Sequence, residues 1–171
     1  MTIKTAILHK GKDAPLRRRH PWVFSGAIRR WEGSPRDGEV VEVRSAAGEL
    51  LGTGHFQDGS IQVRVFAFEQ VEVNTDFWTA KLKNALELRR RLGLPLAGQT
   101  DCYRLIHGEG DGLPGLIIDV YGRTAALQCH SIGMHLHRHE LTEALHRSLG
   151  GDLLAVYDKS ADSLPSAYGP T

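Results

Sequence analysis

The sequence predicts an α+β protein made of two parts, a mostly β part in residues 1–70 and a mixed α+β part in residues 74–171. Residues 3–68 alternate short apolar runs with turn signals, as β domains do. After the segment 69–75, apolar residues recur every three or four positions, which is the period of an amphipathic helix. With 171 residues, of which 41% are hydrophobic, the chain can bury a core in each part.

The first part contains one clear hairpin. Ile61, Val63 and Val65 share one face of a predicted strand, and the turn Asp58-Gly59 can pair this strand with residues 50–56. Upstream, the segment 13–24 is expected to hold a short helical turn before Pro21.

The second part is expected to begin with a helix, capped by Asn74 or Thr75, that runs to about Leu92. Gly93 and Pro95 follow it and stop it. Its apolar stripe consists of Trp78, Leu82, Ala85 and Leu86.

The rest of the second part is expected to form strands 103–107, 116–121 and 124–129, then a helix and a last strand at 153–157. The helix should begin at Ser131 or Gly133 and run to about Leu149, with a buried stripe of Leu136, Leu141, Leu145 and Leu149. Residues 161–171 show no periodic pattern, so they are either a disordered end or the start of a longer natural chain.

The charge distribution is uneven. The formal net charge of the chain is only +1, but residues 1–30 contain eight Lys and Arg against one acid, a balance of +7. The remaining residues contain 13 basic and 19 acidic side chains, a balance of −6. A basic end of this kind indicates either a polyanionic partner or a solvated basic face, and composition alone does not separate the two.

The strongest local pattern is a run of arginines beside two aromatic residues, in segment 16–28. Guanidinium groups bind phosphates and stack on bases, and exposed aromatic rings stack on unpaired nucleotides, so this combination is typical of RNA binding. We expect the cations at the RNA phosphates and the aromatic residues either in the core or in a stacking platform. The candidate RNA-binding residues are Lys10, Lys12, Arg17, Arg18, Arg19, His20, Trp22 and Phe24.

A Gly-rich segment, 108–115, lies between two predicted strands. It lacks the Gly-Lys-Ser/Thr end of a phosphate-binding loop, and Glu109 and Asp111 would repel phosphate. We therefore expect a structural connection in which Asp111 bonds to the backbone of its own turn.

No catalytic, cofactor-binding or metal-binding residue is predicted. His135 and His139 fall one turn apart on the predicted helix, and Glu143 would complete a metalloenzyme alternative, but no further ligand is apparent. Cys102 and Cys129 have no Cys-x-x-Cys spacing or disulfide framework, and we expect both to be buried or half-buried.

The chain contains no apolar stretch of the length that a membrane-spanning helix needs, and its start lacks the apolar core of a secretory signal. Its expected location is therefore the cytoplasm.

Two long segments resemble the bacterial 23S ribosomal RNA cytosine-5 methyltransferases, which depend on S-adenosylmethionine. The first segment consists of Lys10-Gly11-Lys12 and residues 18–28, from Arg18-Arg19-His20-Pro21-Trp22 to Ile28. The second consists of residues 103–106, Gly108-Glu109 and residues 111–119. The likeness extends to about Ser160 and departs from the family in residues 158–169.

The resemblance implies an N-terminal PUA-like β-barrel in residues 1–70, which binds RNA, followed by a central α+β domain in residues 74–171. The family's cofactor site and catalytic cysteine lie in a third, Rossmann-like methyltransferase domain, which we expect to be absent from this sequence. The chain alone is thus expected to be inactive in methyl transfer and to bind large-subunit (23S) ribosomal RNA, not DNA. A dimer is possible, and a stand-alone RNA-binding adaptor is the alternative function.

Overall fold

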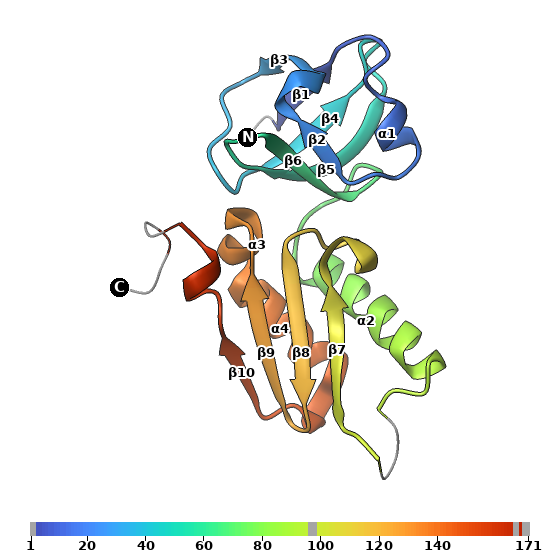
Figure 1. The fold of residues 1–171 in the computed structure, drawn as a ribbon, viewed down its shortest axis with the longest axis vertical. Helices are drawn as coiled ribbons and strands as arrows, with labels where there is room; N and C mark the ends of the chain where they lie inside the picture. The colour runs from blue at the N-terminus through green and yellow to red at the C-terminus, as the bar shows by residue number, and fades with distance from the viewer. Residues whose placement is uncertain (1–2, 96–98, 166–167, 169–171) are drawn as a thin grey trace. The chain divides into compact units, whose positions relative to one another are not determined.

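The computed structural model describes residues 3–95, 99–165 and 168 of the chain. The chain separates into two compact units, Met1–Glu72 and Val73–Thr171. Each unit has its own sheet and its own buried core (Figure 1).

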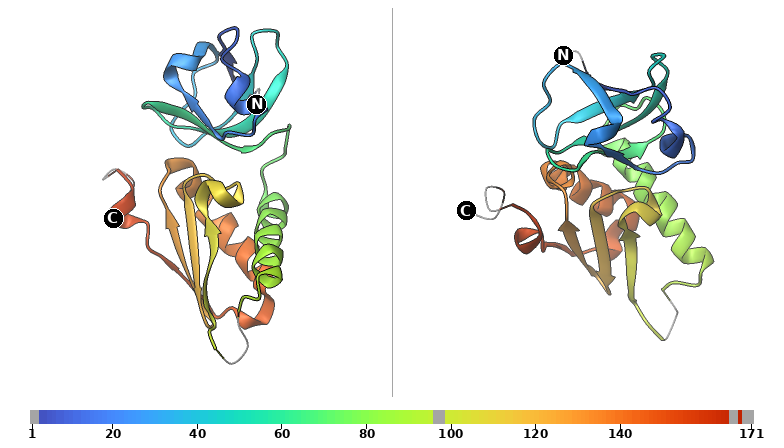
Figure 2. Two further views of the ribbon diagram at one scale, coloured as in Figure 1. Left: turned by 45° about the vertical axis from the view of Figure 1, so that its right-hand side comes forward. Right: turned by 45° about the horizontal axis from the view of Figure 1, so that its top comes forward.

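The first unit is a six-stranded, curled sheet with the order β2-β6-β5-β4-β1-β3 (Figure 2). Adjacent strands are antiparallel except β1 and β4, which are parallel. The predicted hairpin is confirmed, since β5 pairs with β6. The predicted helical turn is α1 (Ala14–Arg17), and the 3-10 turn η1 is Ser25–Ala27. The strands are β1 (Lys4–Leu8), β2 (Trp22–Phe24), β3 (Ile28–Glu32), β4 (Val40–Arg44), β5 (Leu50–Phe56) and β6 (Ile61–Ala67).

Two glycines in β5 allow this strand to approach β6 closely. A Cβ atom at Gly52 would lie 2.7 Å from the carbonyl oxygen of Ala67, and one at Gly54 would lie 2.8 Å from the Cα of Val65. The β5–β6 register shifts between Thr53 and Gly54, which bends the strand and curls the sheet around its core. The core is formed by Ala6, Leu8, Leu16, Val23, Val41, Val43, Leu51, Phe56, Val63 and Val65.

The second unit is a four-stranded sheet with the order β10-β9-β8-β7, covered on one face by helices (Figures 1 and 2). The strands β7, β8 and β9 form an antiparallel meander, and β10 pairs with β9 in parallel. The strands are β7 (Cys102–His107), β8 (Leu116–Tyr121), β9 (Thr124–Cys129) and β10 (Ala155–Asp158). The helices are α2 (Thr75–Arg91), α3 (Ile132–Leu136) and α4 (Arg138–Leu149).

Helix α2 forms as the sequence predicts. The side chain of Asn74 caps it by accepting a hydrogen bond of 3.0 Å from the backbone N–H of Phe77. The predicted stripe is buried, with Trp78 and Leu82 fully so, and it lies against α4 and β7. In the described part of the chain, no helix is long and apolar enough to cross a membrane.

The predicted helix from Ser131 to Leu149 is wrong in one respect, because it is two helices with a break at His137. Ser131 caps α3, and the break turns Leu136 outward, so that this predicted core residue is 49% exposed. Leu141 and Leu145 are fully buried, as expected. The last strand begins two residues later than predicted, at Ala155, although Leu153 is buried.

Beyond β10, two serine side chains bond to the backbone of β9, where the backbone of a paired strand would otherwise do so. The backbone N–H of Cys129 donates to Ser160 Oγ at 2.9 Å, and Ser163 Oγ donates to the carbonyl of Cys129 at 2.8 Å. Residues 161–163 form the 3-10 turn η4 (Ala161–Ser163), where no regular pattern was predicted. Most of the remaining prediction for 161–171 lies outside the described residues.

Candidate RNA-binding surface

All eight candidate RNA-binding residues lie between the end of β1 and the end of β2, in the first unit. Lys10 and Lys12 follow β1 directly, and Arg17 to His20 occupy the end of α1 and the turn after it. The seven candidates other than Trp22 are exposed, and Trp22 is half-buried. The short helix holds this segment in place because Leu16 enters the core.

Helix α1 ends at an arginine in a conformation that favours glycine. Arg19 has φ = 65° and is the only non-glycine residue with positive φ in the described part of the chain. This backbone lets the N–H of Arg19 donate to the Leu16 carbonyl at 2.9 Å and the N–H of His20 donate to the Pro15 carbonyl at 3.0 Å. The guanidinium of Arg19 lies 4.9 Å from the ring centre of Phe68.

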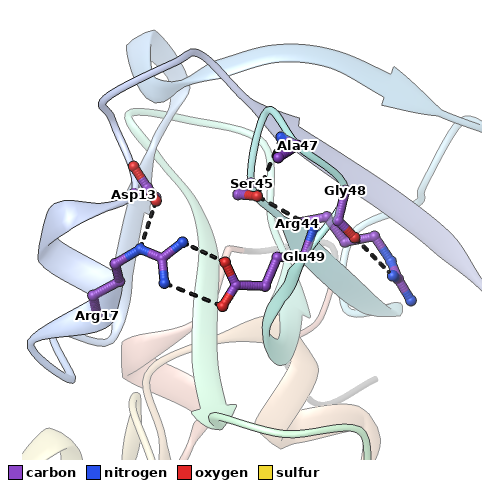
Figure 3. Close-up of polar contacts among 7 residues, drawn as sticks. All are labelled: Asp13, Arg17, Arg44, Ser45, Ala47, Gly48 and Glu49. Carbon is purple, nitrogen blue, oxygen red and sulfur yellow. Dashed lines mark hydrogen bonds and ion pairs between the residues drawn. The ribbon is translucent and has the colours of Figure 1, made fainter.

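Arg17 differs from its neighbours because two carboxylates hold it (Figure 3). Its Nε donates to Asp13 at 2.7 Å, and its two terminal nitrogens form a bidentate pair with Glu49. The hydrogen bonds from Arg17 hold the pKa of both carboxyls below their ordinary values, and they raise the pKa of the guanidinium. Arg17 thus tethers α1 to the turn between β4 and β5, and its charge is neutralised locally.

The turn that carries Glu49 is itself well ordered by side chains (Figure 3). Ser45 Oγ accepts hydrogen bonds from the backbone N–H groups of Ala47 and Glu49, both at 3.2 Å. Arg44 donates to the carbonyl of Gly48 at 3.0 Å. These contacts fix the carboxylate that Arg17 binds.

Besides Arg19, whose guanidinium lies against the Phe68 ring, three of the candidate cations have no acidic partner among the described residues. Among residues 3–95, 99–165 and 168, no acidic side chain forms an ion pair with Lys10, Lys12 or Arg18. All three are exposed, so they present positive charge to solvent. This is the electrostatic arrangement that attracts phosphates.

The two aromatic candidates occupy different environments. Val23, between them, points into the core, whereas Phe24 is 48% exposed and Trp22 is half-buried. The Trp22 ring meets the rings of His20 and Phe24 edge to face, at 5.7 and 6.4 Å between centres. Phe24 is therefore available for stacking, while Trp22 both supports the fold and faces the surface.

The Gly-rich segment is a structural connection, as the sequence predicts. Asp111 forms a bidentate ion pair with Arg89 of α2, at 2.5 and 2.6 Å, and accepts from the backbone N–H of His107 at 2.6 Å. Arg89 also donates to the carbonyl of Arg104 at 2.9 Å. Both side chains of the pair are nearly buried, so this contact fastens α2 to β7 and the turn η2 (Gly108–Asp111).

The geometry disfavours the metalloenzyme alternative. His135 lies on α3 and His139 on α4, so the two are not on one continuous helix. Glu143 instead pairs with Arg147 and accepts from Thr75 Oγ1 at 3.4 Å. No cluster of three His, Cys, Asp or Glu side chains suited to a metal occurs among the described residues.

The cysteines differ in exposure. Cys129 is fully buried, and burial raises its pKa to about 12. Cys102 is exposed, which contradicts the expectation that both are buried or half-buried; it begins β7, opposite the exposed Tyr121 at the end of the β7–β8 ladder. A hydrogen bond to Asp101 raises the pKa of Cys102, so neither thiol is activated as a nucleophile.

Comparison with known proteins finds relatives that match both units of the chain. A family described as a PUA-like domain matches residues 6–68. The ribosomal RNA large subunit methyltransferase I of Erwinia tasmaniensis is 40% identical over 99% of this chain and 42% of its own length. The protein of the same name from Citrobacter koseri is 40% identical over 90% of this chain and 38% of its own length. This chain is a homologue of ribosomal RNA large subunit methyltransferase I over the N-terminal PUA-like and central regions.

The chain spans about two fifths of the length of these methyltransferase I relatives. A protein from Streptococcus mutans described as a SAM-dependent methyltransferase has the same fold over 93% of this chain and 41% of its own, with a TM-score of 0.78 at 20% identity. A methyltransferase structure complexed with SAH aligns with a TM-score of 0.76 at 19% identity, over 91% of this chain and 40% of its own. The PUA-like β unit followed by an α+β unit is thus confirmed.

The described residues do not fit S-adenosylmethionine. A Rossmann-type cofactor site needs a Gly-rich turn between a parallel strand and a helix. Here the Gly-rich segment joins the antiparallel strands β7 and β8, and its Asp111 is already held by Arg89. No step of methyl transfer is therefore assigned to these residues.

Proposed function

We propose that this chain is the RNA-recognition portion of an S-adenosylmethionine-dependent ribosomal RNA (cytosine-5) methyltransferase, and that its first unit binds large-subunit (23S) ribosomal RNA. The binding surface consists of Lys10, Lys12, Arg18, Arg19, His20, Trp22 and Phe24. One observation carries the proposal: the exposed cations Lys10, Lys12 and Arg18 have no acidic partner and lie in the same segment as an exposed aromatic ring. The name of the relatives, ribosomal RNA large subunit methyltransferase I, supports ribosomal RNA as the polyanion.

Within this surface, Arg17 has a positioning role. Two carboxylates already satisfy its guanidinium, so a phosphate would have to compete with Asp13 and Glu49 for it. The phosphate contacts fall instead to its neighbours, which Arg17 holds in place through α1.

The second unit serves as a spacer that orients a methyltransferase domain relative to the RNA. The buried Arg89–Asp111 pair supports this role because it makes the helix–sheet packing rigid at the Gly-rich turn. Methyl transfer is not assigned to the described residues, which offer no activated thiol and no cofactor turn.

The test is binding of the whole chain to a large-subunit ribosomal RNA fragment across a salt series. Each phosphate contact that is lost should lower the dependence of log K on log salt by about 1. The slope of log K against log salt should therefore be smaller by about three for the triple variant Lys10→Ala/Lys12→Ala/Arg18→Ala. Arg17→Ala should leave the slope unchanged.

The matched control removes two exposed cations of the second unit, through Lys83→Ala and Lys159→Ala. This variant should bind as the wild type does. Equal slopes for the wild type and the triple variant would show that the basic segment is only a solvated surface, and the proposal would then fail.

The stand-alone adaptor remains the alternative, and methylation separates the two functions. When the chain is incubated with 23S ribosomal RNA and labelled S-adenosylmethionine, we expect no label in the RNA. Addition of a methyltransferase domain from a relative should restore labelling if the chain is a recognition portion. Unchanged binding without restored labelling would favour the adaptor.

A further inference from the structure

The first unit contains a cavity that lies among the candidate RNA-binding residues. It has a volume of about 210 Å³ and opens between the end of β1, the helix α1 and the strand β2. Its floor consists of the core residues Leu8, Leu16 and Val23. Sites for drug-sized ligands usually measure about 300 to 1,000 Å³, so this cavity fits a smaller, flat group.

The walls and the rim differ in chemistry. Trp22 and Phe24 form aromatic walls whose planes meet at 82°, and Lys12 and His20 lie at the rim. A flat ring that stacks on one of these walls would meet the other with its edge, which is a favourable aromatic geometry. No acidic side chain is among the residues that line the cavity.

The polar groups at the rim are donors. His20 Nδ1 accepts a hydrogen bond of 3.2 Å from the backbone N–H of Trp22, so Nε2 is the ring nitrogen left to donate. The Lys12 ammonium has only donors. The rim therefore matches a ring that presents acceptors, and it offers no side-chain acceptor to an amino group.

On this basis we propose that the cavity binds one unpaired RNA base with a carbonyl oxygen at the position where adenine and cytosine carry an amino group, which is O6 of guanine or O4 of uracil. The inference rests on the proposed RNA-binding function and adds to it a base-specific contact. Lys10 and Arg18, exposed in the same segment, would bind the phosphates on either side of the base. Phosphate contacts position the RNA, and the base in the cavity gives the selectivity.

The test uses short oligonucleotides in which one position carries a base and the others are abasic, so that every ligand has the same charge. Binding to the whole chain is measured by fluorescence anisotropy at constant salt. Guanine should bind more tightly than adenine, and uracil more tightly than cytosine. Each comparison pairs rings of the same size and therefore of similar stacking strength.

The variant Phe24→Ala should weaken the base-containing ligands by about tenfold or more, because loss of one stacking contact has that effect. It should leave the fully abasic ligand unchanged. Phe24→Trp should restore the binding. Tyr157→Ala removes an even more exposed aromatic residue from the second unit and should have no effect. The exposure of Phe24 keeps the variant folded, which a circular dichroism melt verifies.

The outcomes separate the two proposals. If the abasic ligand binds in a salt-dependent manner and as tightly as the ligands with a base, the cavity is not a base site but RNA binding stands. The cavity would then suit an apolar side chain of a protein partner. If adenine binds as tightly as guanine, the donor rim does not select the base. If no ligand binds, both proposals fail.

Discussion

Arg19 combines an unfavourable backbone conformation with an exposed charge. A left-handed conformation costs a non-glycine residue about 1 kcal/mol, and such strain is often found at functional sites. Glycine would remove this cost and would keep the two hydrogen bonds that end α1. The arginine is therefore better explained by what its side chain binds than by the stability of the turn.

Arg19→Gly should separate stability from binding. Because glycine adopts φ = 65° freely, this variant should be about 1 kcal/mol more stable than Arg19→Ala, while both bind ribosomal RNA more weakly than the wild type. Urea unfolding and RNA titration measure the two properties. Arg18 has φ = −91°, so at that position the order should reverse and the glycine variant should be the less stable. The same order at both positions would contradict the strain argument.

Arg17 should make the first unit sensitive to acid. Its hydrogen bonds depress the pKa of Asp13 and Glu49, whose ordinary values are 3.8 and 4.5. Depressed values stabilise the folded state above the ordinary pKa, and this contribution is lost as the pH falls through the depressed values.

The melting temperature of the wild type should thus exceed that of Arg17→Ala at pH 7, and the difference should shrink below about pH 4. Added salt at pH 7 should also reduce the difference, because Arg17 and Glu49 are exposed and Asp13 is only half-buried. A difference that persists unchanged at pH 3 would show that Arg17 acts through packing.

The strand β5 depends on glycine at the point where it bends over β6. A Cβ atom at Gly54 would overlap the Arg64 carbonyl and lie 2.8 Å from the Cα of Val65, and both are backbone atoms that cannot turn aside. We expect Gly54→Ala to destabilise the first unit by about 1 to 3 kcal/mol. Gly26→Ala is the control, because a Cβ atom there has open space. Urea unfolding of both variants checks the difference.

The contact between Arg89 and Asp111 holds helix α2 against β7 and η2. Asp111→Asn would leave the guanidinium of Arg89 nearly buried without its counterion, at a cost of about 3 to 5 kcal/mol. The double variant Arg89→Met/Asp111→Asn also removes the unpaired guanidinium and should recover part of the lost stability. Amide hydrogen exchange in β7 and β8 measures the effect. Equal exchange in the single and the double variant would contradict this assignment.

Prediction from sequence worked where the local signal was strong. The Asn74 cap, the stripe from Trp78 to Leu86 and the Asp58-Gly59 hairpin each depend on neighbouring residues, and each is present in the structure. The break at His137 was missed although Leu136 and Leu141 are five residues apart, a longer spacing than the three or four residues of one helix face. Cys102 was misplaced because its exposure depends on its place opposite Tyr121 at the end of the β7–β8 ladder, and this pairing is not local.

For the candidate surface too, the sequence predicted the features that depend on neighbouring residues and missed those that depend on distant ones. Charge and composition identified the basic segment, but they could not show that Arg17 pairs with Glu49, which is 32 residues away in the sequence. The cavity was also missed, because its floor combines Leu8, Leu16 and Val23 from three separate elements. Apolar residues of this kind have no pattern that distinguishes the lining of a site from the core.

At the scale of the molecule, the excess positive charge is concentrated in residues 1–30, and this should localise RNA binding. Residues 1–30 carry +7 and the remainder carries −6. Bound ribosomal RNA should therefore slow amide hydrogen exchange in residues 8–24 and leave the strands β8 and β9 unchanged. Hydrogen exchange with mass spectrometry of the whole chain checks this. Protection confined to the second unit would place the RNA site there.

The two serines beyond β10 have a consequence for how the protein behaves at high concentration. An open backbone N–H or carbonyl at the end of a strand can recruit a strand from another molecule and begin aggregation. Ser160 and Ser163 occupy both backbone groups of Cys129, so no strand of another molecule can pair with β9 beyond the end of β10. Two hydroxyl groups thus close this gap in the sheet, whose edge strands are β7 and β10.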